Sequence, residues 1–141
     1  MDVPVEDPAW TGDQTATDLI GVLGEFCTAF ERRDSDAVMR LVAPEAALIV
    51  VTSEEAILRG PEELAAFLRR YQQGPTTYSW IWDRYDVGAS GTTGWLLAQG
   101  WETAATAERS ERHPYRMTIA FRQDVERWTP VLIHGSTPHQ P

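Results

Sequence analysis

The second half of the chain alternates apolar and polar side chains with a period of two, in four long stretches. These stretches cover residues 76–87, 94–106, 113–123 and 127–137. They are separated by turn-like segments, namely Gly88-Ala89-Ser90-Gly91, the polar run 108–112 and Asp124-Val125-Glu126. Because strand side chains point alternately to the two faces of a sheet, this pattern predicts four long strands joined by hairpins.

The first half of the chain carries helical spacing instead. Apolar residues recur every three or four positions after Thr15, which predicts a first helix to about Arg33. A second short helix is expected between its cap at Asp34 and Pro44. A short hairpin is predicted from 47–51 and 56–59.

A third helix is predicted to begin at Gly60-Pro61 and to reach Arg69-Arg70, because Pro suits the first helical turn and Arg the last. This order of elements favours an α+β domain. In it, a curved, mostly antiparallel sheet wraps around three N-terminal helices.

Length and charge narrow the class of protein further. A chain of 141 residues that is 43% hydrophobic has the size and composition of one globular domain. We expect that domain over residues 15–138, after a flexible acidic tail over residues 1–14. The net charge of −9 argues against nucleic acid and against an anionic membrane as partners, since both require clustered positive charge.

The single cysteine and the absence of a leader-like segment indicate a cytoplasmic protein. Cys27 has no partner for an internal disulfide, and no Cys/His cluster has the spacing of a zinc site, so no metal is expected. The N-terminus lacks the basic and apolar regions of a signal peptide, and no apolar run is long enough to span a membrane. His113 and His139 are expected to be ordinary surface residues.

Four local motifs occur in an order that resembles the SnoaL-like branch of the nuclear transport factor 2-like superfamily. They are Phe30-Glu31-Arg32-Arg33-Asp34, Arg59-Gly60-Pro61, Pro114-Tyr115-Arg116-Met117-Thr118, and Trp128 followed by His134-Gly135-Ser136. The resemblance covers residues 16–138. It implies a cone-shaped α+β barrel with a pocket between helices and sheet, and a homodimer formed through the outer sheet face.

The resemblance leaves the activity open, because related proteins include cyclases, isomerases, dehydratases and members without a known reaction. Val50 stands where steroid-isomerising relatives carry a general-base Asp. Three other positions, Trp101, Ile119 and Gly135, stand where a related kinase association domain places pocket arginines. The comparison therefore implies an apolar ligand rather than an anionic one.

Hairpin centres near 91, 109 and 125 predict that odd-numbered side chains of the long strands form the apolar, pocket-facing side. On that face Asp83 is our candidate general base, because an apolar setting raises the pKa of a carboxyl. Gln99 could orient a carbonyl. The expected ligand-lining residues are Tyr85, Trp101, Tyr115 and Ile119. Asp83 could equally lie in solvent or pair with an Arg.

The even-numbered face offers an alternative site. The predicted register places Glu102 opposite Arg116 and Arg116 opposite His134, where His134 could shuttle a proton. The same face could instead be a dimer surface that includes Trp80, Trp82 and Leu132. A β-bulge would exchange the two faces.

Taken together, these observations predict a cofactor-free protein with a pocket for a small hydrophobic, aromatic or polyketide-like molecule. If it is an enzyme, proton transfer as in an isomerase, cyclase or dehydratase is expected, since nucleotide motifs and nucleophilic triads are absent. Two alternatives remain: a non-catalytic ligand-binding or dimeric assembly module, and a structural dimer without a cavity.

Overall fold

The computed structural model describes residues 5–6, 12–54 and 56–138. Its elements in chain order are β1 (Val5–Glu6), α1 (Asp13–Glu31), α2 (Ser35–Leu41), β2 (Ile49–Val51), β3 (Ile57–Arg59), α3 (Gly60–Gln73), β4 (Thr77–Ser90), β5 (Thr93–Ala105), β6 (Ser110–Asp124) and β7 (Arg127–Ser136). Most of the tail predicted over residues 1–14 lies outside the described residues, as does His139.

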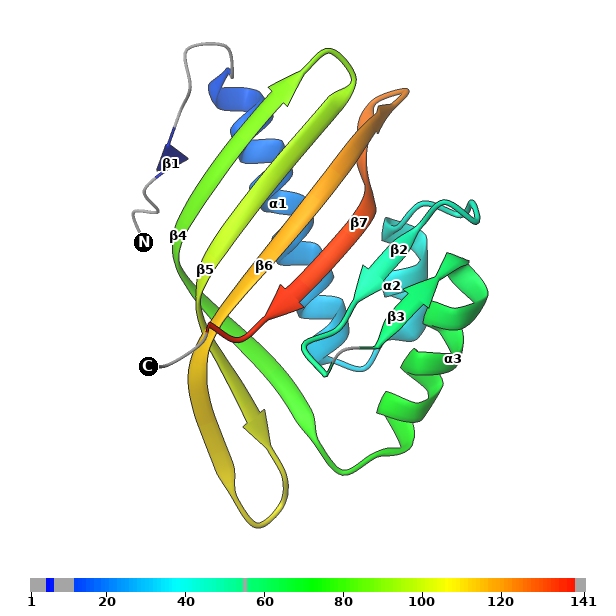
Figure 1. The fold of residues 1–141 in the computed structure, drawn as a ribbon, viewed down its shortest axis with the longest axis vertical. Helices are drawn as coiled ribbons and strands as arrows, with labels where there is room; N and C mark the ends of the chain where they lie inside the picture. The colour runs from blue at the N-terminus through cyan, green and yellow to red at the C-terminus, as the bar shows by residue number, and fades with distance from the viewer. Residues whose placement is uncertain (1–4, 7–11, 55, 139–141) are drawn as a thin grey trace.

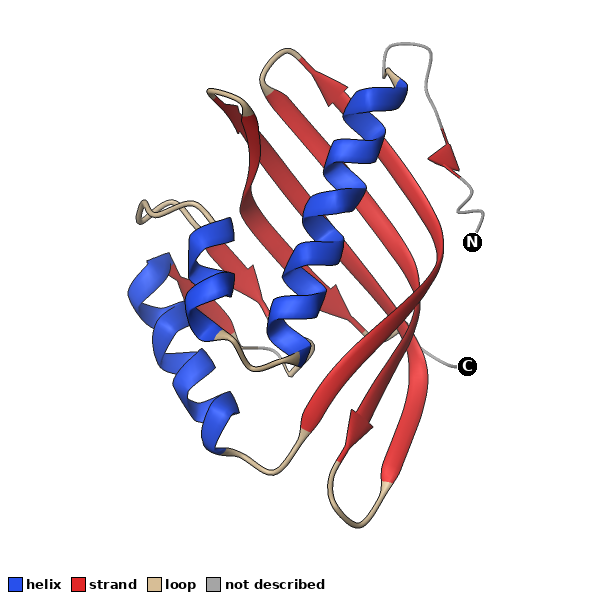
Figure 2. Ribbon diagram, turned by 180° about the vertical axis from the view of Figure 1, so that it is seen from behind, coloured by secondary structure: helices blue, strands red, loops and turns tan. Residues whose placement is uncertain are grey.

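The strands form one mixed sheet in the order β1-β4-β5-β6-β7-β2-β3. The three hairpin connections from β4 to β7 are antiparallel, whereas β1 lies parallel to β4 and β2 lies parallel to β7. The helix α1 crosses one face of this curved sheet, and α2 and α3 lie beside β2 and β3 (Figures 1 and 2). The α+β class and the sheet wrapped around three helices are therefore confirmed.

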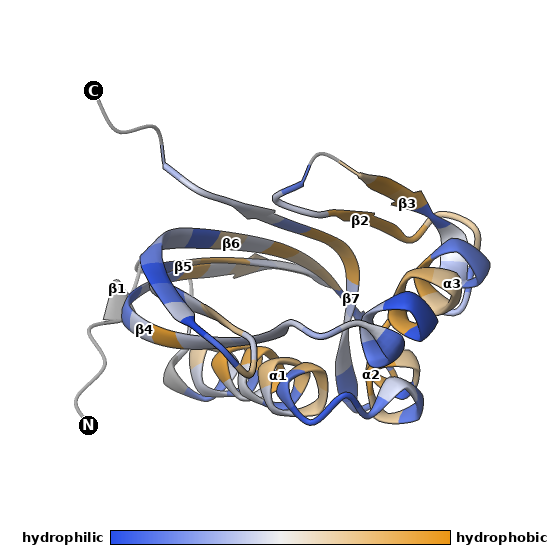
Figure 3. Cartoon of the chain, turned by 90° about the horizontal axis from the view of Figure 1, so that it is seen from below, coloured by the Kyte–Doolittle hydropathy of each residue, from blue (hydrophilic) through white to orange (hydrophobic). Residues whose placement is uncertain are grey.

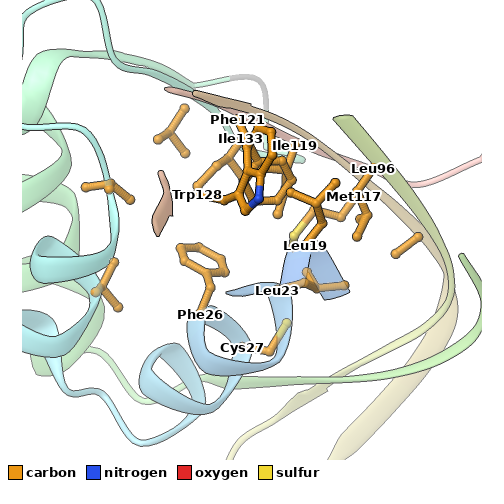
Figure 4. Close-up of a cluster of buried hydrophobic side chains, with 14 of the residues drawn as sticks. Leu19, Leu23, Phe26, Cys27, Leu96, Met117, Ile119, Phe121, Trp128 and Ile133 are labelled. Carbon is orange, nitrogen blue, oxygen red and sulfur yellow. The ribbon is translucent and has the colours of Figure 1, made fainter. Parts of the chain in front are cut away.

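The core forms where α1 packs against the middle of the sheet. Leu19 and Leu23 of α1 are almost fully buried, and so are Leu96, Ile119 and Phe121 of the sheet (Figure 4). The helical spacing of the α1 residues places them on one side of the helix, which is why they meet the sheet together. The hydropathy colouring shows apolar segments of α1 facing the sheet (Figure 3).

Arg33, which follows α1, forms hydrogen bonds that connect the end of α1 to the end of α3. Its guanidinium donates hydrogen bonds to the carbonyl oxygens of Gln72, at 3.1 Å, and Thr76, at 2.7 Å. In return, Nε2 of Gln72 donates to the carbonyl oxygen of Arg33, at 2.7 Å. These bonds fix where the chain leaves α3 and enters β4, a segment that borders the pocket described below.

A β-bulge interrupts β4 at Asp83. Trp82 pairs with Gly100 and Arg84 pairs with Gln99, so Asp83 is the extra residue. Gly100 has no side chain where the two backbones approach: a Cβ on it would lie 2.0 Å from the Ile81 carbonyl oxygen. The bulge re-phases the strand, so that Trp82 and Tyr85 are both buried on the inner face.

The predicted assignment of faces is wrong for β5 and for the first part of β4. Glu102 pairs with His113 rather than with Arg116, and this odd shift turns the even-numbered residues of β5 inward. The bulge has the same effect on β4 before Asp83. The residues that move to the outer face are Ile81, Asp83, Trp95, Leu97, Gln99 and Trp101, whereas Trp80, Trp82 and Glu102 lie on the inner face.

The close approach at Gly100 generates a stability prediction. Gly100→Ala should lower the free energy of unfolding by at least about 2 kcal/mol, because its Cβ would meet backbone atoms of β4 that cannot move aside alone. Gly24→Ala is the matched control, since nothing lies within 4 Å of its Cβ position on the exposed side of α1. It should raise the free energy of unfolding by roughly 0.5–1 kcal/mol.

Urea unfolding of both variants beside the unchanged protein measures the two effects. Equal stability of Gly100→Ala and the unchanged protein would contradict the account of the bulge.

Candidate functional site

A cavity of about 320 Å³ lies between the helices and the inner face of the sheet. Its helix wall consists of Phe26 and Phe30 of α1 and of Leu64, Phe67, Arg70 and Tyr71 of α3. Its sheet wall consists of Tyr78, Trp80, Glu102, Tyr115, Met117 and Ile133. The segments 50–54 and 74–76 and Gly135 complete the lining. The size falls within the range of small-molecule pockets, roughly 300–1,000 Å³.

Glu102 is the buried acidic residue among the described residues of the sheet wall, with 4% of its surface exposed. One carboxyl oxygen, Oε2, accepts a hydrogen bond from Nε1 of Trp80 at 2.9 Å, and Oε1 lies 2.9 Å from Nε2 of His113. Burial raises the pKa of Glu102, and the hydrogen bond from Trp80 and the interaction with His113 oppose that rise.

The three side chains of this group meet because their strands are in register. Trp80 of β4 pairs with Glu102 of β5, and Glu102 pairs with His113 of β6. The three residues form one row across the inner face, and His113 lies at its outer end with 34% of its side chain exposed. His113 therefore connects the buried carboxyl of Glu102 to the solvent-exposed end of the row.

Tyr115 lies next to this row, buried in the same wall. Burial raises its pKa to about 12, against the opposing effect of a hydrogen bond with Ser53, so its hydroxyl stays protonated and keeps a hydrogen to donate. Gly135 makes room for that hydroxyl, because a Cβ on it would lie 2.0 Å from the Tyr115 oxygen. The neighbouring Tyr78 donates to Oε1 of Glu54 at 3.3 Å, and burial raises its pKa to about 12 as well.

Most of the residues predicted from the apolar face lie elsewhere. Asp83 is exposed at the bulge, where it accepts a hydrogen bond from Nε1 of Trp101 at 3.1 Å. Gln99 stands on the outer face beside Arg84 and Arg116 in the sheet register. Tyr85 and Ile119 are buried in the core, away from the pocket lining. Of the predicted binding residues, the structure brings Tyr115 into the pocket.

The residues of the predicted alternative site, Glu102, Arg116 and His134, do not lie together either, because the strand register places them on different faces. Glu102 points inward, whereas Arg116 and His134 are exposed on the outer face. Arg116 pairs with Ser136 and His134 with Thr118, so neither lies opposite Glu102. His113, which the sequence predicts to be an ordinary surface residue, takes the place beside Glu102. The cross-strand pairing of residues 102 and 113 is the one signal that would have identified it.

The described residues hold no group of three or more His, Cys, Asp or Glu side chains that could bind a metal ion. None of the described helices is long and apolar enough to cross a membrane.

An open cone of α+β architecture, with a pocket between its helices and the inner sheet face, defines the nuclear transport factor 2-like class of folds. Within that class the chain belongs to the SnoaL-like family, whose domain model matches residues 20–140. No curated protein sequence matches the chain significantly.

Solved structures from several bacteria share the fold. A Streptomyces avermitilis protein provisionally named a dehydratase of the nuclear transport factor 2-like family has a TM-score of 0.82 at 16% identity, covering 92% of this chain and 100% of that one. A Novosphingobium aromaticivorans protein provisionally named an aromatic ring hydroxylase has a TM-score of 0.77 at 13% identity, covering 88% and 89%.

A Thiobacillus denitrificans protein, provisionally named a calcium/calmodulin-dependent protein kinase type II association domain, has a TM-score of 0.67 at 17% identity, covering 94% and 100%. At such low identities these similarities show the shared fold alone.

The raised pKa of Glu102 predicts a pH-dependent contribution to stability. The native state holds its proton more tightly than the unfolded chain does, so this contribution is complete below the ordinary pKa of Glu. It is lost as pH rises through the raised pKa of the folded state. Glu102→Gln removes the titration. The free energy of unfolding of the unchanged protein, minus that of Glu102→Gln, should therefore decrease as pH rises.

Urea unfolding of both proteins across a pH series starting near 4 measures this difference. A difference that is constant or grows with pH would contradict the stated effect of burial on Glu102.

Proposed function

We propose that the pocket binds a small, largely apolar, ring-containing molecule and that Glu102, assisted by His113, transfers a proton on it. The observation that carries this proposal is a buried carboxyl in an otherwise largely aromatic wall, bonded to an indole on one side and to a half-exposed imidazole on the other.

The lining supports the class of ligand. Aromatic side chains on both walls, among them Phe30, Tyr71 and Trp80, offer ring faces and edges on which a flat molecule can stack. The volume suits one small molecule, such as an aromatic or polyketide-like metabolite.

The groups around Glu102 support acid/base chemistry. A carboxyl with a raised pKa is a more effective base near neutrality, and it could remove a proton from a carbon next to a carbonyl group. The protonated hydroxyl of Tyr115 could donate to the carbonyl oxygen as negative charge develops there. His113 would pass the proton on to water. Isomerisation, cyclisation and dehydration all fit this scheme without a cofactor.

A second candidate function is ligand binding without catalysis. Both carboxyl oxygens of Glu102 already have partners in Trp80 and His113, an arrangement that also suits a purely structural carboxyl. The experiment below separates the two functions.

The proton-transfer proposal predicts activity on a generic probe of carbon deprotonation. Nitrobenzisoxazole is a small aromatic molecule in which removal of the ring C–H proton breaks the N–O bond and yields a coloured cyanophenolate. The protein should accelerate this reaction, with a rate that rises with pH through the raised pKa of Glu102. Glu102→Gln should lower the rate at least about 100-fold.

Asp83→Asn is the matched comparison, because Asp83 is the carboxylate that the sequence favours and it lies outside the pocket lining. A loss of rate in Asp83→Asn with an unchanged rate in Glu102→Gln would overturn the assignment. Binding of the probe to the unchanged protein without acceleration would support the binding function instead.

We also propose that two copies of the chain pair through the outer sheet face. Ile81 is 58% exposed and Trp95 is 41% exposed there, and they replace the inward-facing Trp80 and Trp82 as the apolar residues of that surface. Sedimentation at micromolar concentration should show a dimer. Ile81→Glu should shift it to monomer, because dimer formation would then bury an unpaired charge at the interface. A monomeric unchanged protein would contradict this proposal.

A further inference from the structure

Arg70 is the one cationic side chain among the residues that line the described pocket. It belongs to a stripe of α3 in which Leu64, Phe67 and Tyr71 also reach the lining, at helical spacing. Its guanidinium lies 6.0 Å from the ring centroid of Phe67. The charge is therefore held at the exposed edge of an aromatic wall.

The acidic residues of the lining have other partners. Glu54 accepts a hydrogen bond from Tyr78, and Glu102 is bonded to Trp80 and His113. Within the described residues, the Arg70 guanidinium has no hydrogen bond or ion pair with a carboxylate, and its recorded contact is the ring of Phe67. Its position in the last turn of α3 is favourable for a cation, whereas Arg69, one residue earlier, does not line the pocket.

Arg33, the other guanidinium close to this end of α3, differs from Arg70. It lies 5.0 Å from the ring centroid of Tyr71, but its two terminal nitrogens, Nη1 and Nη2, donate to the carbonyl oxygens of Gln72 and Thr76. It holds the backbone together, whereas Arg70 is available to a ligand.

We propose that the natural ligand of the pocket carries a carboxylate or a similar planar anion that pairs with Arg70 while its ring system lies against the aromatic walls. This inference rests on the proposed ligand-binding function and adds the chemical class of the ligand. It departs from the expectation of a ligand without an anionic group, because Arg70 of α3 lines the pocket. A guanidinium can donate two parallel hydrogen bonds to a carboxylate, which fixes the orientation of the ligand as well as binding it.

The location of Arg70 explains how an acidic protein could bind an anion. The net charge of −9 repels anions at long range, but charges beyond about 8–10 Å are screened at physiological ionic strength. An anion at the exposed Arg70 keeps part of its hydration, while the ring of the ligand is buried. The ligand is thereby oriented with its anion on the helix wall and its ring toward Glu102 on the sheet wall.

Two aromatic probes that differ in charge test the inference. Naphthoate carries a carboxylate, and naphthalenemethanol carries a neutral hydroxymethyl group on the same ring system. Calorimetric titration of each probe into the unchanged protein, Arg70→Gln and Arg69→Gln gives six dissociation constants. Arg69→Gln is the matched control, because it removes the same formal charge from the neighbouring position on α3.

We expect Arg70→Gln to weaken naphthoate binding about tenfold and to change naphthalenemethanol binding less than about twofold, while Arg69→Gln changes neither by more than about twofold. Equal losses of naphthoate binding in the two variants would overturn the role of Arg70, since only general charge would then matter. Unchanged naphthoate binding in Arg70→Gln would overturn it too, while leaving the proposed pocket function intact. Failure of both probes to bind the unchanged protein would contradict the proposed function itself.

Discussion

The close backbone approach between β4 and β5 at Gly100 is the constraint on which the candidate site depends. Because Gly100 has no Cβ, the bulge at Asp83 can fold over it, and β4 can change phase within a few residues. Before the bulge Trp80 points into the pocket, and after it Tyr85 points into the core. Without this change of phase, β4 could not supply both a pocket wall and part of a continuous apolar core.

The Glu102 row illustrates how a sheet can hold a buried carboxyl. An isolated buried carboxylate is strongly unfavourable, and it is tolerated here because the flanking strands each supply a partner at 2.9 Å. The two partners of Glu102 have different surroundings. Trp80 donates from within the aromatic wall, whereas His113 connects the carboxyl to solvent. Under the proposed function, the same pairing that stabilises Glu102 also gives its proton a path to solvent.

The sequence predicted the fold well because the signals for elements are local. Helix and strand spacing located all three helices and the four long strands to within a few residues, and the motif order identified the family. The prediction of the site residues was wrong because it depends on the pairing register of the strands, and register is not determined by local sequence. In β5 both faces are apolar, with Trp95 and Leu97 on one and Leu96 and Ala98 on the other, so alternation could not decide which face is buried. An error of three residues in the pairing of β5 with β6 then exchanged Arg116 for His113.

The two walls of the pocket have different structural origins, one in the helices and one in the sheet. Glu102, Tyr115 and their partners stand on strands whose positions are fixed by the cross-strand register, so substitutions there disturb the sheet as well as the site. Arg70 and Phe67 stand on α3, which meets the end of α1 through the stacked rings of Phe30 and Tyr71 and through Arg33, which follows α1. Under the proposed function, changes on the pocket side of α3 alter which molecule is bound without moving Glu102. Such a division fits a family in which one fold carries many activities.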